Sequence, residues 1–210
     1  MTVLVTGAAG FIGYSTVLAL LDAGRRVIGI DNLNDYYDVS LKQARLDKLL
    51  ARDGFTFSCI DIAERQAVDA LFTEHSAISE VIHLAAQPGV RYSLINPYAY
   101  TRTNIEGHLV LLEASRKLPG LKHFVYASSS SVYGDSSDVP FSTSKRTDTP
   151  VSLYAATKKS MEMMSHAYAH IYRMPLTGLR FFTVYGPWGR PDMAYYSFTK
   201  NILSGQPIPV

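Results

Sequence analysis

Apolar and polar residues alternate along this chain in blocks of two distinct lengths. Short apolar runs have the length of β-strands, at residues 2–6, 25–30, 55–60, 80–86, 122–130 and 176–182. Longer segments with helical periodicity separate them, near residues 11–23, 39–51, 64–73, 98–117 and 153–173. This order is typical of right-handed βαβ units, and it predicts an α/β fold with a doubly wound parallel sheet. The strand runs are apolar throughout, as expected for a sheet covered on both faces.

The remaining segments add little regular structure to this pattern. The longest polar stretch, residues 134–152, predicts a loop at the carboxyl edge of the sheet. The single cysteine, Cys59, lies in the third apolar run, so we expect it to be a buried strand residue. One cysteine cannot form an internal disulfide.

Composition and charge exclude several classes of function. The 210 residues are 47% hydrophobic and 18% charged, which suits one soluble globular domain with a substantial core. The net charge is only +2 and the basic residues are dispersed, so we expect no nucleic-acid partner. No apolar stretch approaches the roughly 18 residues of a membrane span, and no secretory signal pattern opens the chain. We therefore expect a cytoplasmic protein without membrane contact.

Three glycines follow the first predicted strand directly, in the sequence TGAAGFIG from Thr6 to Gly13. In this position Gly7 would make a tight turn, Gly10 would let the backbone approach a pyrophosphate, and Gly13 would let the helix lie close to the strand. The phosphates would contact free amides at a helix N-terminus. The alternative interpretation is a glycine-rich turn without a ligand.

Two aspartates follow the next two strand runs. Asp31 lies 24 residues after Gly7, where a carboxylate can bind both ribose hydroxyls and repel a 2′-phosphate, which favours NAD over NADP. Asp61, with Ile62 after it, is placed to receive an adenine amino group. The alternative role for each aspartate is to cap local structure.

A tyrosine and a lysine lie four residues apart in the predicted helix that follows the fifth strand. The sequence YAATK places Tyr154 and Lys158 on one helical face, and SSSSVYG ends the preceding strand at the edge where such sheets bind ligands. Tyrosine, lysine and a serine hydroxyl together make a general base with its activator and orienting group. Ordinary helix residues are the alternative.

Lys158 is expected to lower the pKa of Tyr154. A tyrosine titrates near pH 10, so a neutral-pH base needs about 4 kcal/mol of stabilisation of its phenolate. One ammonium at about 4 Å supplies roughly that amount at an effective dielectric of 20, and a cationic nicotinamide would add to it. Without either cation we expect a protonated tyrosine.

These segments resemble the extended short-chain dehydrogenase/reductase family, which contains nucleotide-sugar epimerases and dehydratases. The resemblance covers almost the whole chain, because TGAAGFIG, DNLNDYYD, HLAAQPGVRYS, SSSSVYG, YAATK and LRFFTVYGPWGRPDMA occur in family order. It implies a Rossmann-like fold, NAD as cofactor, a nucleotide-sugar substrate and a catalytic triad of Ser129, Tyr154 and Lys158. The cofactor-binding residues that it implies, besides Tyr154 and Lys158, are Gly7, Gly10, Phe11, Ile12, Gly13, Asp31, Asn32, Asp61, Ile62, Leu84, Ala85, Ala86, Gln87 and Asn104.

Within that family the chain is most similar to the UDP-glucuronate 4-epimerases. The 4,6-dehydratases carry an Asp-Glu pair where this chain has Ser130 and Ser131, so dehydration is disfavoured. At the position of Thr183, many UDP-galactose 4-epimerases carry an asparagine. The uronate epimerases carry a threonine there, as this chain does. The resemblance implies epimerisation through a 4-keto intermediate, with a place in polysaccharide biosynthesis.

The same resemblance suggests which residues contact the substrate. Thr183 and Arg190 would recognise a carboxylate, which a guanidinium binds with two hydrogen bonds, and Arg91 is a second candidate. Pro88 and Ser129 complete the implied substrate set. The alternatives are that Arg190 is a surface loop cation and that Arg91 is a structural ion-pair partner.

Two other classes of function stay open at this point. One is another nucleotide-sugar enzyme of the same fold, such as a UDP-glucose 4-epimerase, a dehydratase, a decarboxylase or a reductase. The other is a noncatalytic nicotinamide-binding module, whose usual sign would be a broken triad. His166 and His170 lie four apart on a helix, but no third ligand accompanies them, so we expect no metal.

The chain divides into two predicted parts. Residues 1–175 would form the NAD-binding domain with the triad, and residues 176–210 would form the last strand and the beginning of a substrate-binding part. The sequence ends in a predicted helix and an extended segment, so we expect the small C-terminal domain of the family to be largely absent and turnover to be doubtful. Family members often pair the helices near 98–117 and 153–173, which implies a homodimer.

Overall fold

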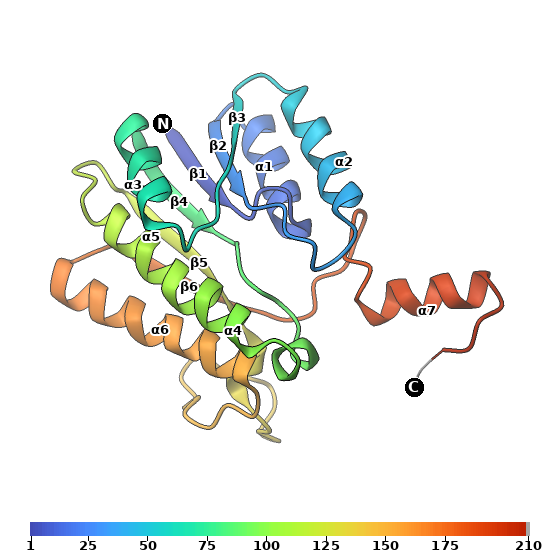
Figure 1. The fold of residues 1–210 in the computed structure, drawn as a ribbon. Coiled ribbons are helices and arrows are strands. Elements are labelled where there is room, and N and C mark those ends of the chain that lie inside the picture. Colours follow the sequence, from blue (N-terminus) through green and yellow to red (C-terminus); the bar gives the residue numbers. More distant parts are fainter. Residues whose placement is uncertain (209–210) are drawn as a thin grey trace.

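The structure is a computed structural model that describes residues 1–208, and it contains a six-stranded parallel sheet. The strand order is β3-β2-β1-β4-β5-β6, so the chain crosses from one half of the sheet to the other between β3 and β4 (Figure 1). This topology confirms the predicted doubly wound α/β fold. The strands are β1 Thr2–Thr6, β2 Arg26–Asp31, β3 Phe55–Cys59, β4 Ile78–His83, β5 His123–Ser129 and β6 Leu176–Phe181.

The helices cover both faces of this sheet (Figure 1). Their bounds follow the predicted segments closely, with one exception described below. The α-helices are α1 Phe11–Asp22, α2 Val39–Leu50, α3 Arg65–Glu74, α4 Pro97–Tyr100, α5 Gly107–Ser115, α6 Leu153–Tyr172 and α7 Ala194–Leu203. Short 3₁₀ segments are η1 Arg91–Leu94 and η3 Ser130–Tyr133, and η2 Thr101–Glu106 is π-helical.

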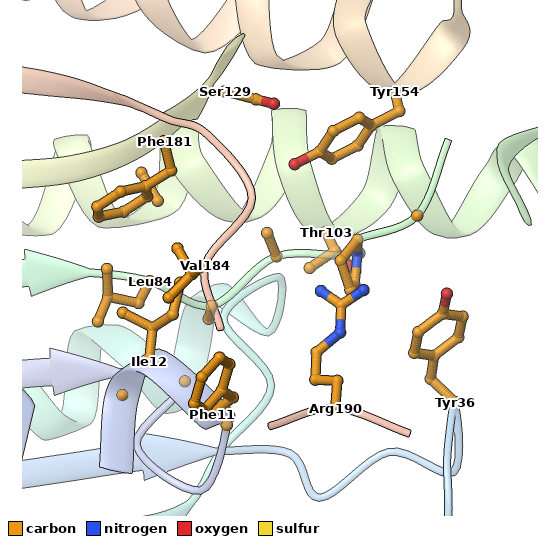
Figure 2. A pocket seen from close by; sticks show the side chains of 18 of the residues that line it. Phe11, Ile12, Tyr36, Leu84, Thr103, Ser129, Tyr154, Phe181, Val184 and Arg190 are labelled. Carbon is orange, nitrogen blue, oxygen red and sulfur yellow. The ribbon is translucent and has the colours of Figure 1, made fainter. Parts of the chain in front are cut away.

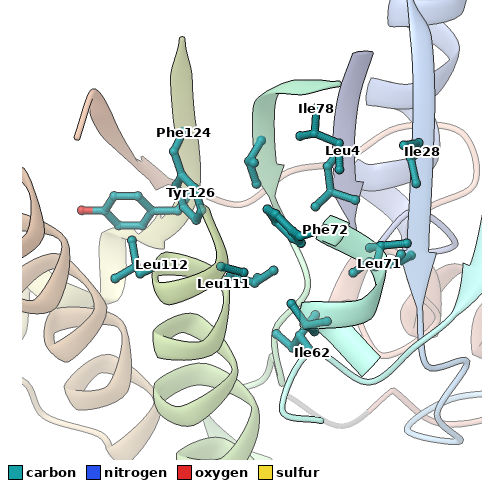
Figure 3. Close-up of a cluster of buried hydrophobic side chains, with 14 of the residues drawn as sticks. Leu4, Ile28, Ile62, Leu71, Phe72, Ile78, Leu111, Leu112, Phe124 and Tyr126 are labelled. Atoms are coloured by element: carbon teal, nitrogen blue, oxygen red, sulfur yellow. The ribbon is translucent and has the colours of Figure 1, made fainter. Parts of the chain in front are cut away.

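Alternate residues of the central strands face two separate hydrophobic clusters. On β1, Leu4 packs with residues of α3, α5 and α6, whereas Val3 and Val5 pack against α1 and α2. Figure 3 shows the first cluster, where Leu71 and Phe72 of α3 meet the sheet. Burial on both faces explains why the strand runs are apolar throughout.

The predicted helix at residues 98–117 is divided in the structure. A π-helical segment, η2, separates α4 from α5 and contains the fully buried Asn104. A wider turn of this kind allows a side chain to leave the regular helical spacing, and such turns are frequent at functional sites. The sequence pattern predicted the helix but not this irregularity.

Cys59 is exposed, so its predicted burial was wrong. It is the last residue of β3, the edge strand of the sheet, which pairs only with β2. An apolar run does not distinguish an edge strand from a central one, and this explains the error.

The last elements lie at the side of the sheet that carries β6. The predicted loop at residues 134–152 precedes α6, and β6 pairs in parallel with β5. Helix α7 contributes no buried residue, exposes Leu203, and lies away from the body of the sheet in Figure 1. Among residues 1–208, none of the helices has both the length and the apolar character that a membrane crossing requires.

Candidate active site

A cavity of about 370 Å³ opens at the carboxyl ends of the parallel strands. Open α/β sheets bind ligands at this edge, where the strand order reverses. Figure 2 shows Ser129 and Tyr154 on one side of the cavity and Phe11, Ile12 and Leu84 on the other. Predicted site residues that line it are Gly7, Gly10, Phe11, Ile12, Gly13, Asp31, Asn32, Asp61, Ile62, Leu84, Ala85, Ala86, Pro88, Ser129, Tyr154, Lys158, Thr183 and Arg190.

The glycine turn at the base of the cavity has no room for side chains. Gly7 has φ +71°, and a Cβ there would lie 2.8 Å from the amide nitrogen of Ala85. A Cβ on Gly13 would lie 1.9 Å from the carbonyl oxygen of Gly7. The turn therefore needs both glycines, one for its backbone conformation and one for the close approach of α1.

The N-terminus of α1 faces the cavity without an acidic group. Gly10 caps the helix with no side-chain hydrogen bond, and the first turn contains no Asp or Glu. Free amides and the positive end of the helix dipole therefore remain available at this point. A pyrophosphate is the kind of ligand that such a terminus binds.

A buried arginine supports the glycine turn from behind. Arg45 of α2 is fully buried, and its Nη1 donates to the Ala9 carbonyl at 2.9 Å and to the Tyr37 hydroxyl at 2.7 Å. Its Nη2 donates to the Trp188 carbonyl at 2.7 Å. One guanidinium thus connects the glycine turn to the segment that follows β6.

Asp31 lies at the end of β2 with its carboxylate beside the glycine turn. Its Oδ2 accepts a hydrogen bond from the Ala9 amide at 3.2 Å, and its Oδ1 accepts one from the Leu33 amide at 2.8 Å. The buried Lys42 places its Nζ 3.9 Å from Oδ1 and donates to Asn34 at 2.9 Å. A ribose bound here would meet both a carboxylate and an ammonium.

Asp61 follows β3 and is held by three donors. The Ala63 amide donates to Oδ1 at 2.9 Å, while Arg102 at 2.6 Å and Asn32 at 3.3 Å donate to Oδ2. Burial raises the pKa of this carboxyl, but the hydrogen bonds outweigh burial and the pKa is lowered overall. Asp61 is therefore a charged acceptor on the wall of the cavity.

Gln87 and Asn104 lie behind the cavity wall rather than on it. The Asn104 side chain accepts from the Gln87 amide at 2.8 Å and donates to the Gln87 carbonyl at 3.1 Å. It also donates to Thr157 of α6 at 3.1 Å. Neither residue lines the cavity, and together they tie the segment after β4, at Gln87, to α6.

The structure brings Ser129, Tyr154 and Lys158 together at the ends of β5 and α6. The Ser129 hydroxyl points toward the Tyr154 ring in Figure 2, and a hydrogen bond between them lowers the pKa of Tyr154. Lys158 is buried, with its Nζ 6.0 Å from the centre of the Tyr154 ring. That Nζ donates to the Ala127 carbonyl at 2.7 Å.

The expected effect of Lys158 on Tyr154 is not seen. Burial raises the pKa of Tyr154 above its ordinary value, and the Ser129 hydrogen bond and the Arg190 charge oppose it only in part. Burial also lowers the pKa of Lys158 to about 7. The sequence-based estimate took a fully charged lysine, whereas burial disfavours the charged form of Lys158.

Of the three predicted carboxylate-binding residues, two reach the cavity. Thr183 and Arg190 line it, and Arg190 already makes a two-point ion pair with Asp192, at 2.9 Å from Nε and 2.6 Å from Nη2. Tyr36 donates to the same carboxylate at 3.2 Å. Arg91 is exposed on η1 and does not line the cavity, so its predicted role is not supported.

Several cavity residues were not predicted from the sequence. Lys42, Tyr36, Thr103 and Met193 line the cavity, and Asp192 pairs with Arg190 at its mouth. A signal was available for Lys42, which lies on the same helix face as Leu46 and Leu49 and, with Arg45, interrupts its apolar residues.

The predicted absence of a metal site has no counterexample in the described residues. His166 and His170 are exposed on α6, and no group of three or more His, Cys, Asp or Glu residues within 1–208 is arranged to hold a metal ion.

A family model described as the NAD dependent epimerase/dehydratase family matches residues 3–210. The chain belongs to this family. A 37.6 kDa protein from Escherichia coli O111:H- is 57% identical over the whole chain, and UDP-glucuronate 4-epimerase 1 from Arabidopsis thaliana is 54% identical. The family assignment agrees with the resemblance that the sequence segments indicated.

The fold is also that of a solved UDP-glucuronic acid 4-epimerase from Bacillus cereus, in complex with UDP-glucuronic acid and NAD. The TM-score is 0.92 and the identity is 38%, with 99% of this chain and 65% of that chain covered. This chain spans 62% of the Escherichia coli protein and 48% of the Arabidopsis protein. The chain therefore spans about half to two thirds of the length of these relatives.

Proposed function

We propose that this chain carries the NAD-binding and proton-transfer parts of a nucleotide-sugar 4-epimerase that interconverts UDP-glucuronate and UDP-galacturonate. The observation that carries the proposal is the common cavity, which joins the glycine turn of β1 to Ser129, Tyr154 and Lys158. The relatives named as UDP-glucuronate 4-epimerases support the choice of substrate.

The cavity residues fit NAD. Gly7 and Gly13 allow the tight turn and the close approach of α1 that present its N-terminal amides to a pyrophosphate, and Asp31 supplies the carboxylate for a ribose. Asp61 and Ile62 would contact the adenine, and Leu84 to Ala86 would line the nicotinamide half. When bound, NAD would accept hydride from C4 of the sugar and return it to the opposite face.

The side chains of α6 and β5 would move the proton that accompanies this hydride. Tyr154 would take the proton of the sugar 4-hydroxyl, with Ser129 hydrogen-bonded to the phenolate and Lys158 supplying positive charge. Because burial raises the pKa of Tyr154, the base form needs the further positive charge of the oxidised nicotinamide. The 4-keto sugar would then turn in the cavity and regain its proton from Tyr154.

The substrate carboxylate would be recognised by Thr183 and Arg190. The Arg190 guanidinium lines the cavity. Its pair with Asp192 uses Nε and Nη2, so Nη1 remains available to a ligand. A carboxylate would bind there by charge-assisted hydrogen bonds. Ser130 and Ser131 supply neither acid nor base beside Ser129, which favours epimerisation over dehydration.

The same proposal includes a division of the chain into two parts, a homodimer and a cytoplasmic location. Residues 1–175 would form the NAD-binding domain, and residues 176–210 the beginning of the substrate-binding part. Exposed apolar side chains on α5 and α6, including Leu109, Met163 and Ile171, support a homodimer built on these helices. A cytoplasmic location and a supply of uronate for polysaccharide synthesis follow from the proposed reaction.

Turnover of UDP-glucuronate with added NAD tests the proposal, with products separated by chromatography. We expect UDP-galacturonate to form, and Tyr154→Phe to lower kcat by about 10²- to 10⁴-fold without weakening NAD binding in calorimetry. Tyr172→Phe, at the far end of the same helix, is the matched control and should retain full activity. NAD binding without conversion of any UDP-sugar would reject the activity for this chain and favour a nicotinamide-binding module.

A further inference from the structure

Three residues of α6 contact three consecutive residues of β5. Tyr154, Lys158 and Glu162 are four residues apart, so they lie on one face of the helix. Lys158 donates to the Ala127 carbonyl at 2.7 Å, and the Ser128 hydroxyl donates to Glu162 at 2.6 Å. Tyr154 faces the next strand residue, Ser129, whose hydroxyl donates to Ser131 at 3.1 Å. Glu162 is the one helix residue of the three that has no part in the proposed chemistry.

Glu162 is also fixed from the neighbouring strand. Arg180 of β6 donates from Nε and Nη2 to the two carboxylate oxygens of Glu162, each at 2.9 Å. Ser128 and Arg180 are direct partners in the β5–β6 register. One carboxylate therefore ties α6 to the same level of two adjacent strands.

This ion pair is shielded from solvent and remains charged. The side chains of Glu162 and Arg180 are 14% and 17% exposed. Burial raises the pKa of Glu162, but the Arg180 and Ser128 hydrogen bonds outweigh it and lower the pKa overall. A two-point arginine–carboxylate pair has a defined geometry, unlike a surface ion pair between flexible side chains.

We propose that Glu162 is a positioning residue for the proton-transfer site, because it ties α6 to β5 and β6 and thereby holds Tyr154 of that helix beside Ser129. Loss of its contacts to Ser128 and Arg180 would let α6 shift on the sheet and take Tyr154 away from Ser129. The inference rests on the proposed function, in which Ser129 stabilises the Tyr154 phenolate. Glu162 itself touches neither ligand in this scheme.

The pKa of Tyr154 tests this role, and the sign of its change distinguishes positioning from simple charge. Glu162→Gln removes a negative charge, which alone would lower the pKa of Tyr154. Loss of the Ser129 hydrogen bond would instead raise it, by about one unit if one bond to the phenolate is weakened. The chain labelled with ¹³C at tyrosine Cζ would be titrated by NMR with saturating NAD, and Tyr154→Phe would assign the resonance.

We expect the pKa of Tyr154 to rise by about one unit in Glu162→Gln and in Ser128→Ala, which leaves all charges in place. Glu80→Gln is the matched control, since it breaks an ion pair of 2.7 Å with Arg25 at the opposite ends of the strands. No change, a lower pKa, or an equal rise in Glu80→Gln would overturn the inference. If Glu162→Gln fails to fold, Ser128→Ala decides the question.

Turnover separates this inference from the proposed function. With UDP-glucuronate we expect both variants to lose about tenfold in kcat with little change in KM, because the phenolate fraction falls tenfold per pKa unit at fixed pH. A raised pKa in a chain that converts no UDP-sugar would reject the proposed function and leave the positioning role intact. A Tyr154 resonance that does not titrate below pH about 11 with NAD bound would overturn both.

Discussion

The two walls of the cavity are built in different ways. On the β1–α1 side, the backbone forms the site, and what matters is that Gly7 and Gly13 have no side chains. On the β5–α6 side, side chains form it: Ser129 interacts with Tyr154, and Lys158 donates to the Ala127 carbonyl. Added side-chain atoms should therefore disrupt the first wall, and removal of polar groups should disrupt the second.

This difference predicts which substitutions each wall resists. A methyl group added to the glycine turn has no space to enter, because its neighbours are backbone atoms that cannot rotate away. A polar group removed from the β5–α6 wall leaves a buried partner without its hydrogen bond, and the loss of stability then depends on the protonation state of that wall's side chains. Substitutions in the first wall should therefore act through added volume, and those in the second should change how stability depends on pH.

The largest effect on stability is expected from Gly13→Ala. Its Cβ would lie 1.9 Å from the Gly7 carbonyl oxygen, so α1 must move away from the turn. We expect a loss of about 3 kcal/mol in the free energy of unfolding, measured by urea denaturation, together with loss of NAD binding. Gly120→Ala, with no atom within 4 Å of the added carbon, should cost nothing. Equal losses in the two variants would contradict the role assigned to the turn.

The second effect is a rise of stability with pH that comes from Lys158. Burial lowers its pKa to about 7 in the folded state, while in the unfolded chain a lysine titrates near about 10.4. Between these values the unfolded state binds more protons, so the free energy of unfolding increases with pH and falls as the pH drops toward 7. From pH 7 to pH 9 we expect a gain of about 2 kcal/mol from this group.

Lys158→Met should remove this gain, which urea denaturation at pH 7, 8 and 9 would show as a difference in slope between the two proteins. Lys117→Met, which removes an exposed lysine of an ion pair with Asp69, is the matched control and should retain the slope. A parallel pH dependence in all three proteins would mean that Lys158 is not buried as the structure has it.

The smallest effect is expected at the N-terminus of α6. The Ser152 hydroxyl accepts a hydrogen bond from the Ala155 amide at 3.1 Å and caps the helix that carries Tyr154. Ser152→Ala should lower the free energy of unfolding by about 1 kcal/mol. Thermal denaturation beside Ser137→Ala, in the exposed loop, checks this, and an equal effect of the two substitutions would show that the cap contributes nothing.

The sequence predicted the glycine wall more fully than the other. A turn and the helix after it are local, so the spacing of Gly7, Gly10 and Gly13 was enough to predict a shape that the structure contains. On the second wall, the spacing of Tyr154 and Lys158 predicted their common face. It could not predict burial, which raises the pKa of Tyr154 and lowers that of Lys158.

Pairs distant in sequence account for what the sequence did not predict. Glu162 and Arg180 meet only because β6 lies beside β5, and Tyr36 reaches Asp192 from a loop 156 residues earlier. Arg91 shows the reverse case, since it follows the cavity residue Pro88 closely in sequence but is exposed on η1 and does not line the cavity. Nearness along the chain was a poor guide wherever the backbone left a regular element.

The bonds of Arg45 have a consequence for redesigning what this protein recognises. Its guanidinium binds both the Ala9 carbonyl and the Trp188 carbonyl, so the glycine turn and the segment between Thr183 and Arg190 are held by one side chain. Both acceptors are backbone oxygens, which any amino acid supplies. The Trp188 ring, however, packs against Tyr14 and Lys48, and its backbone has φ +64°, so both the side chain and the main-chain path are fixed here. Under the proposed function, a foreign loop grafted here to change sugar preference should succeed only if it reproduces this left-handed position, because otherwise the glycine turn and NAD affinity would change with it.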